Sequence, residues 1–326
     1  MTRDLTPPPE RAFPAGRLQL RKEQLVSHIH AEQSPLLAAP SSRRRFAFGA
    51  AGLAAVAAVA AAVVLFGTGT AGPSPAAAAV LRHAARTAAQ QPATDPPAPG
   101  QFVYTKSEGT FVDGAQTNNQ TISFYETDTR EAWIGPDGSG RLRGTASPPT
   151  FVTPADRAAW IAAGKPRLSG NPHSDETYRA GGLSYLDLSK LPSDPAQLKQ
   201  LIEERKIEGG PPGDAETFTI IGDLLRETYA SPGVRSALYT IASELPGVEL
   251  VGAVHDPLGR SGTAVAYVAH GSRDELIFDP HTSALLAERQ VATDGSYVPV
   301  GTVLESNAFI SSGVVDSTSA TTTSQP

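Results

Sequence analysis

The sequence predicts one transmembrane helix followed by an exported α+β domain, in which an antiparallel sheet, curved or rolled into a half-barrel, packs with helices. Residues 46–66 contain no charged side chain, and 21 helical residues at about 1.5 Å each cover about 31 Å, the thickness of a bilayer's hydrocarbon core. From residue 101, short segments alternate apolar and polar residues between Asp-Gly and Asn-rich turns, which predicts antiparallel strands. Residues 194–245 carry apolar side chains at helical spacing.

The charges on either side of the apolar run predict its orientation. Arg43, Arg44 and Arg45 directly precede it, and residues 1–45 hold eight basic and four acidic residues, a net charge of +4. Residues 46–326 hold 19 basic and 29 acidic residues, a net charge of −10. By the positive-inside rule the short basic end is cytoplasmic and the long acidic part lies outside the cell membrane. The acidic exterior argues against nucleic acid as a partner.

The same stretch also fits a cleaved export signal. Residues 42–46 read S-R-R-R-F, the core of a twin-arginine signal, and Ala76 and Ala78 supply small residues for a cleavage site. Against this interpretation, the segment before the arginines is long, and the apolar run exceeds the roughly 7 to 15 residues of a typical signal core. A retained anchor is favoured, and twin-arginine export stays an alternative.

The cytoplasmic tail, residues 1–45, contains a predicted short amphipathic helix over residues 16–32. Leu18, Leu25 and Ile29 fall on one side of this helix, opposite charged residues, and form the candidate partner-binding face. A helix of this length is marginal alone in water, so we expect it to lie on the membrane surface or to fold on a protein partner.

Residues 67–100 are predicted to connect the membrane span with the exported domain. The Ala-rich residues 74–89 favour a juxtamembrane helix, and the Pro-rich residues 90–100 end that helix and hold the next domain off the bilayer. The exported domain is assigned to residues 101–310. Residues 311–326 are Ser/Thr-rich without periodicity, so we expect them to be disordered.

The first half of the exported domain is predicted to be mostly β. Strands are expected at 101–108, 121–127, 130–134 and 141–144. Thr153 as N-cap and Pro154 at the first helical position predict a helix that ends near residue 163. Residues 169–178, which include His173, are predicted to form a polar loop.

The second half is predicted to contain three helices and then a β-meander. Helices are expected over 194–206, 218–228 and 234–245, each with apolar residues on one face. Strands are expected at 248–255, 263–269, 275–279 and 285–291. The short connections between these strands favour a meander.

An ordered series of short motifs runs through the second half. The series is L-P-S-D-P from Leu191, L-L-R from Leu224, S-P-x-x-R-x-A-L-Y from Ser231, D-x-x-G-R-x-G from Asp256 and L-I-F-D-P from Leu276. With the arginine-preceded span and the strand G-Q-F-V-Y from Gly100, it resembles a family of actinobacterial single-pass membrane proteins of mostly uncharacterised function, often encoded beside extracytoplasmic-function sigma factors. The resemblance implies a cytoplasmic tail, one span and an exported α+β domain, and it supplies no catalytic or ligand-binding residues.

Signals for an enzyme are weak. The chain has no cysteine, which excludes disulfides, thiolate metal sites and a cysteine nucleophile. Ser261 has candidate bases at His255, Asp256, Asp279 and His281, but residues 259–262, G-R-S-G, do not match the G-x-S-x-G elbow and lie between two predicted strands. We expect His255, His270 and His281 to be solvated at strand ends, with no metal or other cofactor.

Six aromatic residues of the β half are candidates for the core of the sheet. They are Phe102, Tyr104, Phe124, Tyr125, Trp133 and Trp160. A packed core is the favoured interpretation, although on a curved sheet the same side chains would line a cavity for a lipid or a peptide.

The favoured function is a non-enzymatic, membrane-anchored extracytoplasmic sensor or regulator that lies across the lipid bilayer. Its cytoplasmic tail is expected to contact a protein partner such as the sigma factor that the resemblance implies. One alternative is an exported carrier of lipid or another hydrophobic molecule, which predicts an apolar cavity within residues 100–311. A less favoured alternative is a twin-arginine-exported hydrolase that uses Ser261.

Overall fold

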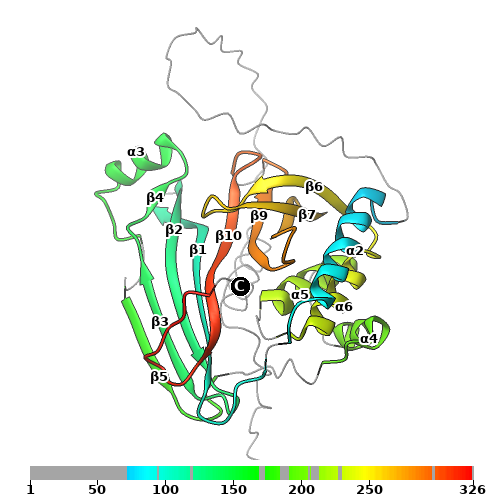
Figure 1. Ribbon diagram of the computed structural model, residues 1–326. Helices are drawn as coiled ribbons and strands as arrows, with labels where there is room; N and C mark the ends of the chain where they lie inside the picture. The colour runs from blue at the N-terminus through cyan, green and yellow to red at the C-terminus, as the bar shows by residue number, and fades with distance from the viewer. Residues whose placement is uncertain are drawn as a thin grey trace, which may run out of the picture. The chain divides into compact units, whose positions relative to one another are not determined.

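The computed structural model describes residues 72–93, 95–117, 120–168, 173–183, 191–204, 206, 213–226, 230–295 and 298–324. All of them belong to one compact unit (Figure 1). The apolar run 46–66, the three arginines Arg43, Arg44 and Arg45, and the face formed by Leu18, Leu25 and Ile29 lie outside the described residues. Among the helices that are described, none is both long enough and apolar enough to cross a membrane.

One antiparallel sheet of ten strands organises the described part of the chain. The strands are β1 (Phe102–Thr117), β2 (Gln120–Ile134), β3 (Gly140–Ala146), β4 (Thr150–Phe151), β5 (His173–Tyr178), β6 (Val248–His255), β7 (Ser261–Ala269), β8 (Ser272–Phe278), β9 (Leu285–Ala292) and β10 (Val303–Val315). Their order in the sheet is β5-β3-β2-β1-β10-β9-β8-β7-β6, with the short β4 beside β2. The path ends at β5 and β6, so the sheet does not close on itself. These findings confirm the α+β class and the antiparallel sheet.

Five helices accompany the sheet in the described residues. They are α2 (Pro75–Ala89), α3 (Pro154–Ala162), α4 (Pro195–Glu204), α5 (Asp214–Arg226) and α6 (Pro232–Ala242). Helices α2, α4, α5 and α6 form a group, whereas α3 lies apart from them beside β2 and β4 (Figure 1). The group buries Leu81, Phe218 and Leu238 in one core with Val265 and Phe278 of the sheet. The main hydrophobic core therefore lies between these four helices and strands β7 to β10.

Helix α2 belongs to this core, although the sequence predicts a juxtamembrane helix outside the exported domain. Its buried face consists of Ala77, Ala78, Leu81, Ala84, Ala85 and Ala88. This face packs mainly against α6, where small alanine side chains let two helix axes approach closely. At its start, the Ser74 N–H donates to the Val248 carbonyl of β6 at 3.0 Å. The folded unit therefore begins before residue 101, and the Pro-rich segment connects two parts of it.

Strands β1 and β2 form a longer hairpin than the sequence predicts. The expected break between 127 and 130 is absent, because β2 continues through Asp128 opposite Gly109 of β1. A Cβ atom at position 109 would lie 2.8 Å from the Asp128 Oδ1 atom. Glycine at this position leaves room for the inserted carboxylate, so the strand does not need to end there.

The predicted polar loop 169–178 is wrong over its second half, because residues 173–178 form the edge strand β5. This strand pairs with β3, and five of its six residues are exposed. The sequence H-S-D-E-T-Y has no apolar alternation, since neither face of the strand is buried. Edge strands of this kind give no signal in hydrophobic periodicity.

The local signals of the remaining elements are confirmed. Helix α3 starts with Thr153 as N-cap: the Thr153 hydroxyl accepts a hydrogen bond from the Asp156 N–H, and the Asp156 carboxylate accepts one from the Thr153 N–H, which completes a capping box. The three predicted helices of the second half correspond to α4, α5 and α6, and strands β6 to β9 form the predicted meander.

The end of the chain differs from the expected disordered tail. Residues 303–315 form β10, which lies in the middle of the sheet between β1 and β9. Residues 316–324 follow it as an ordered segment without regular secondary structure. The Ser/Thr-rich composition concealed both features, because β10 gains its stability from pairing with strands far away in sequence.

The motifs behind the family resemblance form turns and helix caps. Ser231 caps α6, and its hydroxyl accepts a hydrogen bond from the Val234 N–H. Asp279 accepts hydrogen bonds from the N–H groups of His281 and Thr282 and so closes the turn between β8 and β9. The buried Tyr239 hydroxyl donates to the Ser283 carbonyl of that turn at 2.5 Å. These motif residues fix the turns and the position of α6 on the sheet.

Candidate functional site

Of the residues in the hydrolase hypothesis, His255, Asp256 and Ser261 lie at the turn between β6 and β7, whereas Asp279 and His281 lie in the turn between β8 and β9. His255 lies directly opposite Ser261 in the strand register, and both residues are exposed. The Asp256 carboxylate stabilises the turn, because it accepts hydrogen bonds from the backbone N–H groups of Leu258 and Arg260 and from the Arg260 guanidinium. The register therefore brings a serine and a histidine together, while Asp256 accepts hydrogen bonds within the D-x-x-G-R turn and Asp279 accepts hydrogen bonds within the β8–β9 turn.

The three candidate histidine ligands are spread over the sheet. His255 lies opposite the first residue of β7, whereas His270 follows its last residue, about 30 Å away at roughly 3.3 Å per strand residue. His281 lies in the turn between β8 and β9. Within the described residues, no group of three or more His, Cys, Asp or Glu side chains is close enough to hold a metal ion.

The six candidate core aromatics divide between separate clusters. Tyr104 and Trp133 are about 1% exposed and pack with Val315, Phe102 and Ala320. Phe124 is equally buried, but it lies on the opposite face of β2 from Trp133, because nine residues separate them in an uninterrupted strand. Trp160 of α3 contacts Phe151. These aromatics therefore do not line one common cavity.

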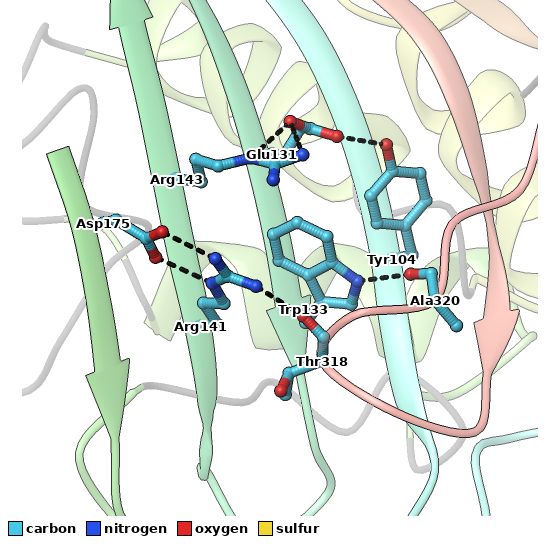
Figure 2. Close-up of polar contacts among 8 residues, drawn as sticks. All are labelled: Tyr104, Glu131, Trp133, Arg141, Arg143, Asp175, Thr318 and Ala320. Atoms are coloured by element: carbon cyan, nitrogen blue, oxygen red, sulfur yellow. Dashed lines mark hydrogen bonds and ion pairs between the residues drawn. The ribbon is translucent and has the colours of Figure 1, made fainter. Parts of the chain in front are cut away.

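A polar and aromatic cluster on strands β1, β2, β3 and β5 is the candidate functional site. The register places Tyr104, Trp133 and Arg141 side by side, and two residues further along it places Lys106, Glu131, Arg143 and Asp175 side by side. Side chains two residues apart in a strand share a face, so the two rows lie on one surface. We call Tyr104, Glu131, Trp133, Arg141, Arg143 and Asp175 the Trp133 face (Figure 2).

Trp133 is the centre of this face. The guanidinium carbons of Arg141 and Arg143 each lie 5.4 Å from the centre of its ring, and the Tyr104 ring lies 5.2 Å away. Cation–π contacts of this kind contribute about 0.5–2 kcal/mol, depending on how far water is excluded. Two arginines and a tyrosine therefore hold the indole in one orientation.

Glu131 links Tyr104 and Arg143. It accepts a hydrogen bond from the Tyr104 hydroxyl at 2.8 Å and another from the Arg143 Nε at 2.8 Å. Burial opposes ionisation, but these hydrogen bonds outweigh it and lower the pKa of Glu131. Burial, together with the hydrogen bond to the carboxylate, raises the pKa of Tyr104 to about 12. At neutral pH the carboxylate is ionised and the phenol keeps its proton.

Arg141 is fixed by a second carboxylate. Its Nε and Nη2 donate to the two carboxylate oxygens of Asp175 on β5 at 2.7 and 2.6 Å. The hydrogen bonds from Arg141 lower the pKa of Asp175. This fork-to-fork geometry restricts the guanidinium and leaves its remaining nitrogen, Nη1, directed toward the end of the chain.

The ordered segment 316–324, which we call the C-terminal strap, lies across the Trp133 face (Figure 2). The Trp133 Nε1 donates to the Ala320 carbonyl at 2.6 Å, and the Arg141 Nη1 donates to the Thr318 carbonyl at 3.2 Å. The strap then returns to β10, where the Ser312 N–H donates to the Ser324 carbonyl at 3.0 Å. The face therefore binds a polypeptide segment through main-chain carbonyl groups.

This mode of contact depends little on side-chain identity. Both donors from the face meet carbonyl oxygens, which every residue carries, and the strap supplies only small side chains around them. The arrangement thus fits an extended or loosely coiled polypeptide with small residues. The two carboxylates of the face, Glu131 and Asp175, are each paired with an arginine.

Sequence reasoning found only part of this site. Tyr104 and Trp133 were in the candidate aromatic set, whereas Arg141, Arg143, Glu131 and Asp175 were not candidates. The available signal was the alternation R-L-R at 141–143, which places two arginines on one face of a strand. Placing Arg141 and Arg143 beside Trp133 requires the register between β2 and β3, which cannot be predicted from the sequence.

Comparisons with known proteins give little further information. No protein-family model matches the chain, and no curated protein matches it either. Among solved structures, the complex of MucA and MucB from Pseudomonas aeruginosa matches 73% of this chain and 57% of the chain compared, with 14% sequence identity and a TM-score of 0.26. A likeness at this level assigns neither a family nor a function.

Proposed function

We propose that the protein is a membrane-anchored extracytoplasmic regulator, without enzymatic activity, whose exterior domain binds a polypeptide segment on the Trp133 face. The single observation that carries this proposal is the C-terminal strap, which a buried tryptophan and an arginine hold by its main-chain carbonyls. A surface that binds one such segment within the chain has the donors to bind another.

The membrane location in this proposal comes from the sequence. The uncharged run 46–66, the preceding arginines and the change from +4 to −10 in net charge support a single span with the folded unit outside. The cytoplasmic half of the proposal is a protein contact through Leu18, Leu25 and Ile29, and a sigma factor is the partner class that the family resemblance suggests.

Orientation is testable because the chain has no native cysteine. Single substitutions Ser27→Cys in the tail and Ser261→Cys in the exposed β6–β7 turn provide two labelling positions. With a membrane-impermeant maleimide, the Ser261→Cys protein should be labelled on intact cells and the Ser27→Cys protein only after lysis. The mass of the mature protein distinguishes a retained anchor from a cleaved twin-arginine signal.

Binding by the Trp133 face is tested with a synthetic peptide of residues 316–326 and a shortened chain that ends after Val315 and therefore lacks the strap. The Trp160→Phe substitution leaves Trp133 as the sole tryptophan, so its fluorescence reports the peptide directly. Saturable binding is expected. Arg141→Ala should weaken it by about 1 kcal/mol, roughly fivefold, because the hydrogen bond from the Arg141 Nη1 to the Thr318 carbonyl is lost.

The matched control is Arg157→Ala, which removes an exposed arginine from α3 and should leave the peptide affinity unchanged. No saturable change in Trp133 fluorescence at millimolar peptide would contradict the binding role of this face. The cytoplasmic contact is tested separately, by co-purification of residues 1–45 with a candidate extracytoplasmic-function sigma factor from the same organism. Absence of binding at micromolar concentration would remove that part of the proposal.

A further inference from the structure

We propose that the C-terminal strap is a displaceable internal ligand, so that a polypeptide segment of another protein binds the Trp133 face only when the strap leaves it. This inference rests on the proposed binding function and adds its regulation. Three observations support it: the strap is more exposed than the aromatic side chains it covers, the arginines of the face form their ion pairs without it, and the strap pairs with an edge of β10 that β9 leaves open.

Burial is unequal across the contact. Trp133 and Tyr104 are each 1% exposed, so the two aromatic side chains of the face are covered. None of the residues 316–324 is itself buried, and Asp316, Ser319 and Thr321 are exposed. Ala320, which is partly buried, is the strap residue that packs against the Tyr104–Trp133 cluster. The strap contributes no residue to the main hydrophobic core between the helices and the sheet, so its departure leaves that core closed.

Charge leads to the same conclusion. The strap has one charged residue, Asp316, and its carboxylate accepts a hydrogen bond from the Gln101 Nε2 at 2.9 Å. Residues 317–324, S-T-S-A-T-T-T-S, carry no charge, so the part of the strap that contacts the face offers its arginines no carboxylate. Arg141 and Arg143 take their carboxylates from Asp175 and Glu131, which belong to the face itself. The ion pairs and the orientation of the arginines therefore persist when the strap departs. The face stays preorganised for another segment.

The attachment of the strap to β10 identifies the form that a competing segment takes. Strand β10 pairs with β9 only over Val303–Ala308, whereas it pairs with β1 as far as Val315. On the stretch beyond Ala308, the Ser312 N–H donates to the strap at Ser324. A competing segment can accept the same hydrogen bond by adding to this edge of β10, which is the geometry of β-strand addition.

Attachment to the same chain gives the strap an advantage over a free peptide. A short flexible connection produces an effective concentration in the millimolar range. A free peptide of the same sequence with an affinity near 100 μM should therefore bind the full chain about tenfold more weakly than a chain without the strap. This difference is the quantity that the experiment measures.

The strap can be locked reversibly with one designed disulfide. A Cβ atom built on Gly313 lies 3.7 Å from the Thr322 Cβ, within the range that disulfides require. Gly313 has an ordinary backbone conformation, and the nearest Thr322 atom, Cγ2, is removed by the second substitution. The Gly313→Cys/Thr322→Cys variant, in a chain with no other cysteine, holds the strap when oxidised and releases it when reduced.

The test measures the binding of a fluorescent peptide of residues 316–326 by anisotropy to the full chain in detergent. We expect the tightest binding to the chain that ends after Val315, about tenfold weaker binding to the full chain, and no binding to the oxidised double-cysteine variant. Reduction should restore the affinity of the full chain. The single variants Gly313→Cys and Thr322→Cys are the controls, because neither responds to oxidant by closing a bridge.

The outcomes separate this inference from the proposed function. Equal affinity of the shortened chain, the full chain and the oxidised variant would overturn the internal-ligand role while leaving peptide binding intact. Absence of binding to the shortened chain and to the reduced variant alike would count against the binding function itself. If the shortened chain fails to fold, as judged by circular dichroism, the oxidised and reduced forms of one protein still decide the question.

Discussion

Asp256 allows a sharp test of whether the turn D-x-x-G-R is structural or belongs to a hydrolase site. Its side chain is fully buried and accepts from the Leu258 N–H at 3.0 Å, the Arg260 N–H at 2.8 Å and the Arg260 Nε at 2.6 Å. The Asp256→Ala substitution leaves two backbone donors and a guanidinium without this acceptor. Breaking a buried ion pair costs about 3–5 kcal/mol.

The lower end of that range applies here. The Arg260 side chain is 21% exposed and keeps its hydrogen bond to the Leu286 carbonyl at 2.8 Å. Its charge therefore still contacts solvent and one acceptor after Asp256 is removed. We therefore expect Asp256→Ala to reduce the unfolding free energy by about 3 kcal/mol. Asp256→Asn should cost less, because its amide oxygen still accepts from the two backbone N–H groups.

The assay is urea unfolding of the full chain in a mild detergent, followed by circular dichroism. With a slope of about 2 kcal/mol per molar urea, the midpoint of Asp256→Ala should fall by about 1.5 M. Asp95→Ala, at an exposed position in the Pro-rich segment, is the control and should stay within about 0.5 kcal/mol of the parent. A loss below about 1 kcal/mol for Asp256→Ala would refute the structural role and return Asp256 to the candidates for an acid beside His255 and Ser261.

Three further variants test the electrostatics and packing of the sheet by the same unfolding assay. Burial opposes ionisation of Glu131, but its hydrogen bonds outweigh burial and lower its pKa below 4.5. The ionised carboxylate therefore stabilises the fold fully above pH 4.5, and this stability is lost as the pH falls through the pKa of the folded state. Glu131→Gln should abolish this loss of stability in acid. Burial raises the pKa of Asp128 above 3.8, so the ionised carboxylate opposes folding at neutral pH. Asp128→Asn should therefore raise the urea midpoint at pH 7. At about pH 3 the carboxyl group is protonated in both the folded and the unfolded chain, so the midpoint should change little. Gly222→Ala places a Cβ atom 2.7 Å from the Glu288 Oε1 and should cost about 1–3 kcal/mol.

Each of these variants has an outcome that contradicts the structural explanation. If the urea midpoint of Glu131→Gln fell with decreasing pH as steeply as that of the parent, the hydrogen bonds of Glu131 would contribute nothing to stability. A lower midpoint at pH 7 in Asp128→Asn would show that the carboxylate is stabilising as an ion. For the packing variant, Gly295→Ala is the control because no atom lies within 4 Å of its built Cβ, and equal stability of both alanine variants would show that α5 moves away without cost.

The elements that the sequence predicts well are those specified by neighbouring residues. The start of α3 follows from Thr153, Pro154 and Asp156, whose side chains satisfy the first N–H groups of the helix. The meander β6 to β9 follows from short turns between apolar strands. Here propensity, capping and turn chemistry all agree, and no distant contact is needed to choose the structure.

The elements that the sequence does not reveal depend on pairing over long distances. Strand β5 is exposed on both faces, and β10 lies between β1 and β9 although more than 180 residues separate it from β1. The same limit applies to the Trp133 face. Its tryptophan and tyrosine are recognisable as large apolar side chains, but the strap that covers them returns from the far end of the chain, and no local pattern encodes that contact.

The hydrogen bond from the Trp133 Nε1 to the Ala320 carbonyl provides the most direct test of polypeptide binding on this face. The measurement is hydrogen exchange of the indole N–H by NMR in a full chain with labelled tryptophan, with the Trp160→Phe substitution to assign the two indole signals. The indole proton should be protected in the intact chain, exposed when the chain ends after Val315, and protected again when the peptide 316–326 is added. Equal protection in all three samples would contradict the assignment of the Trp133 face as a polypeptide-binding surface.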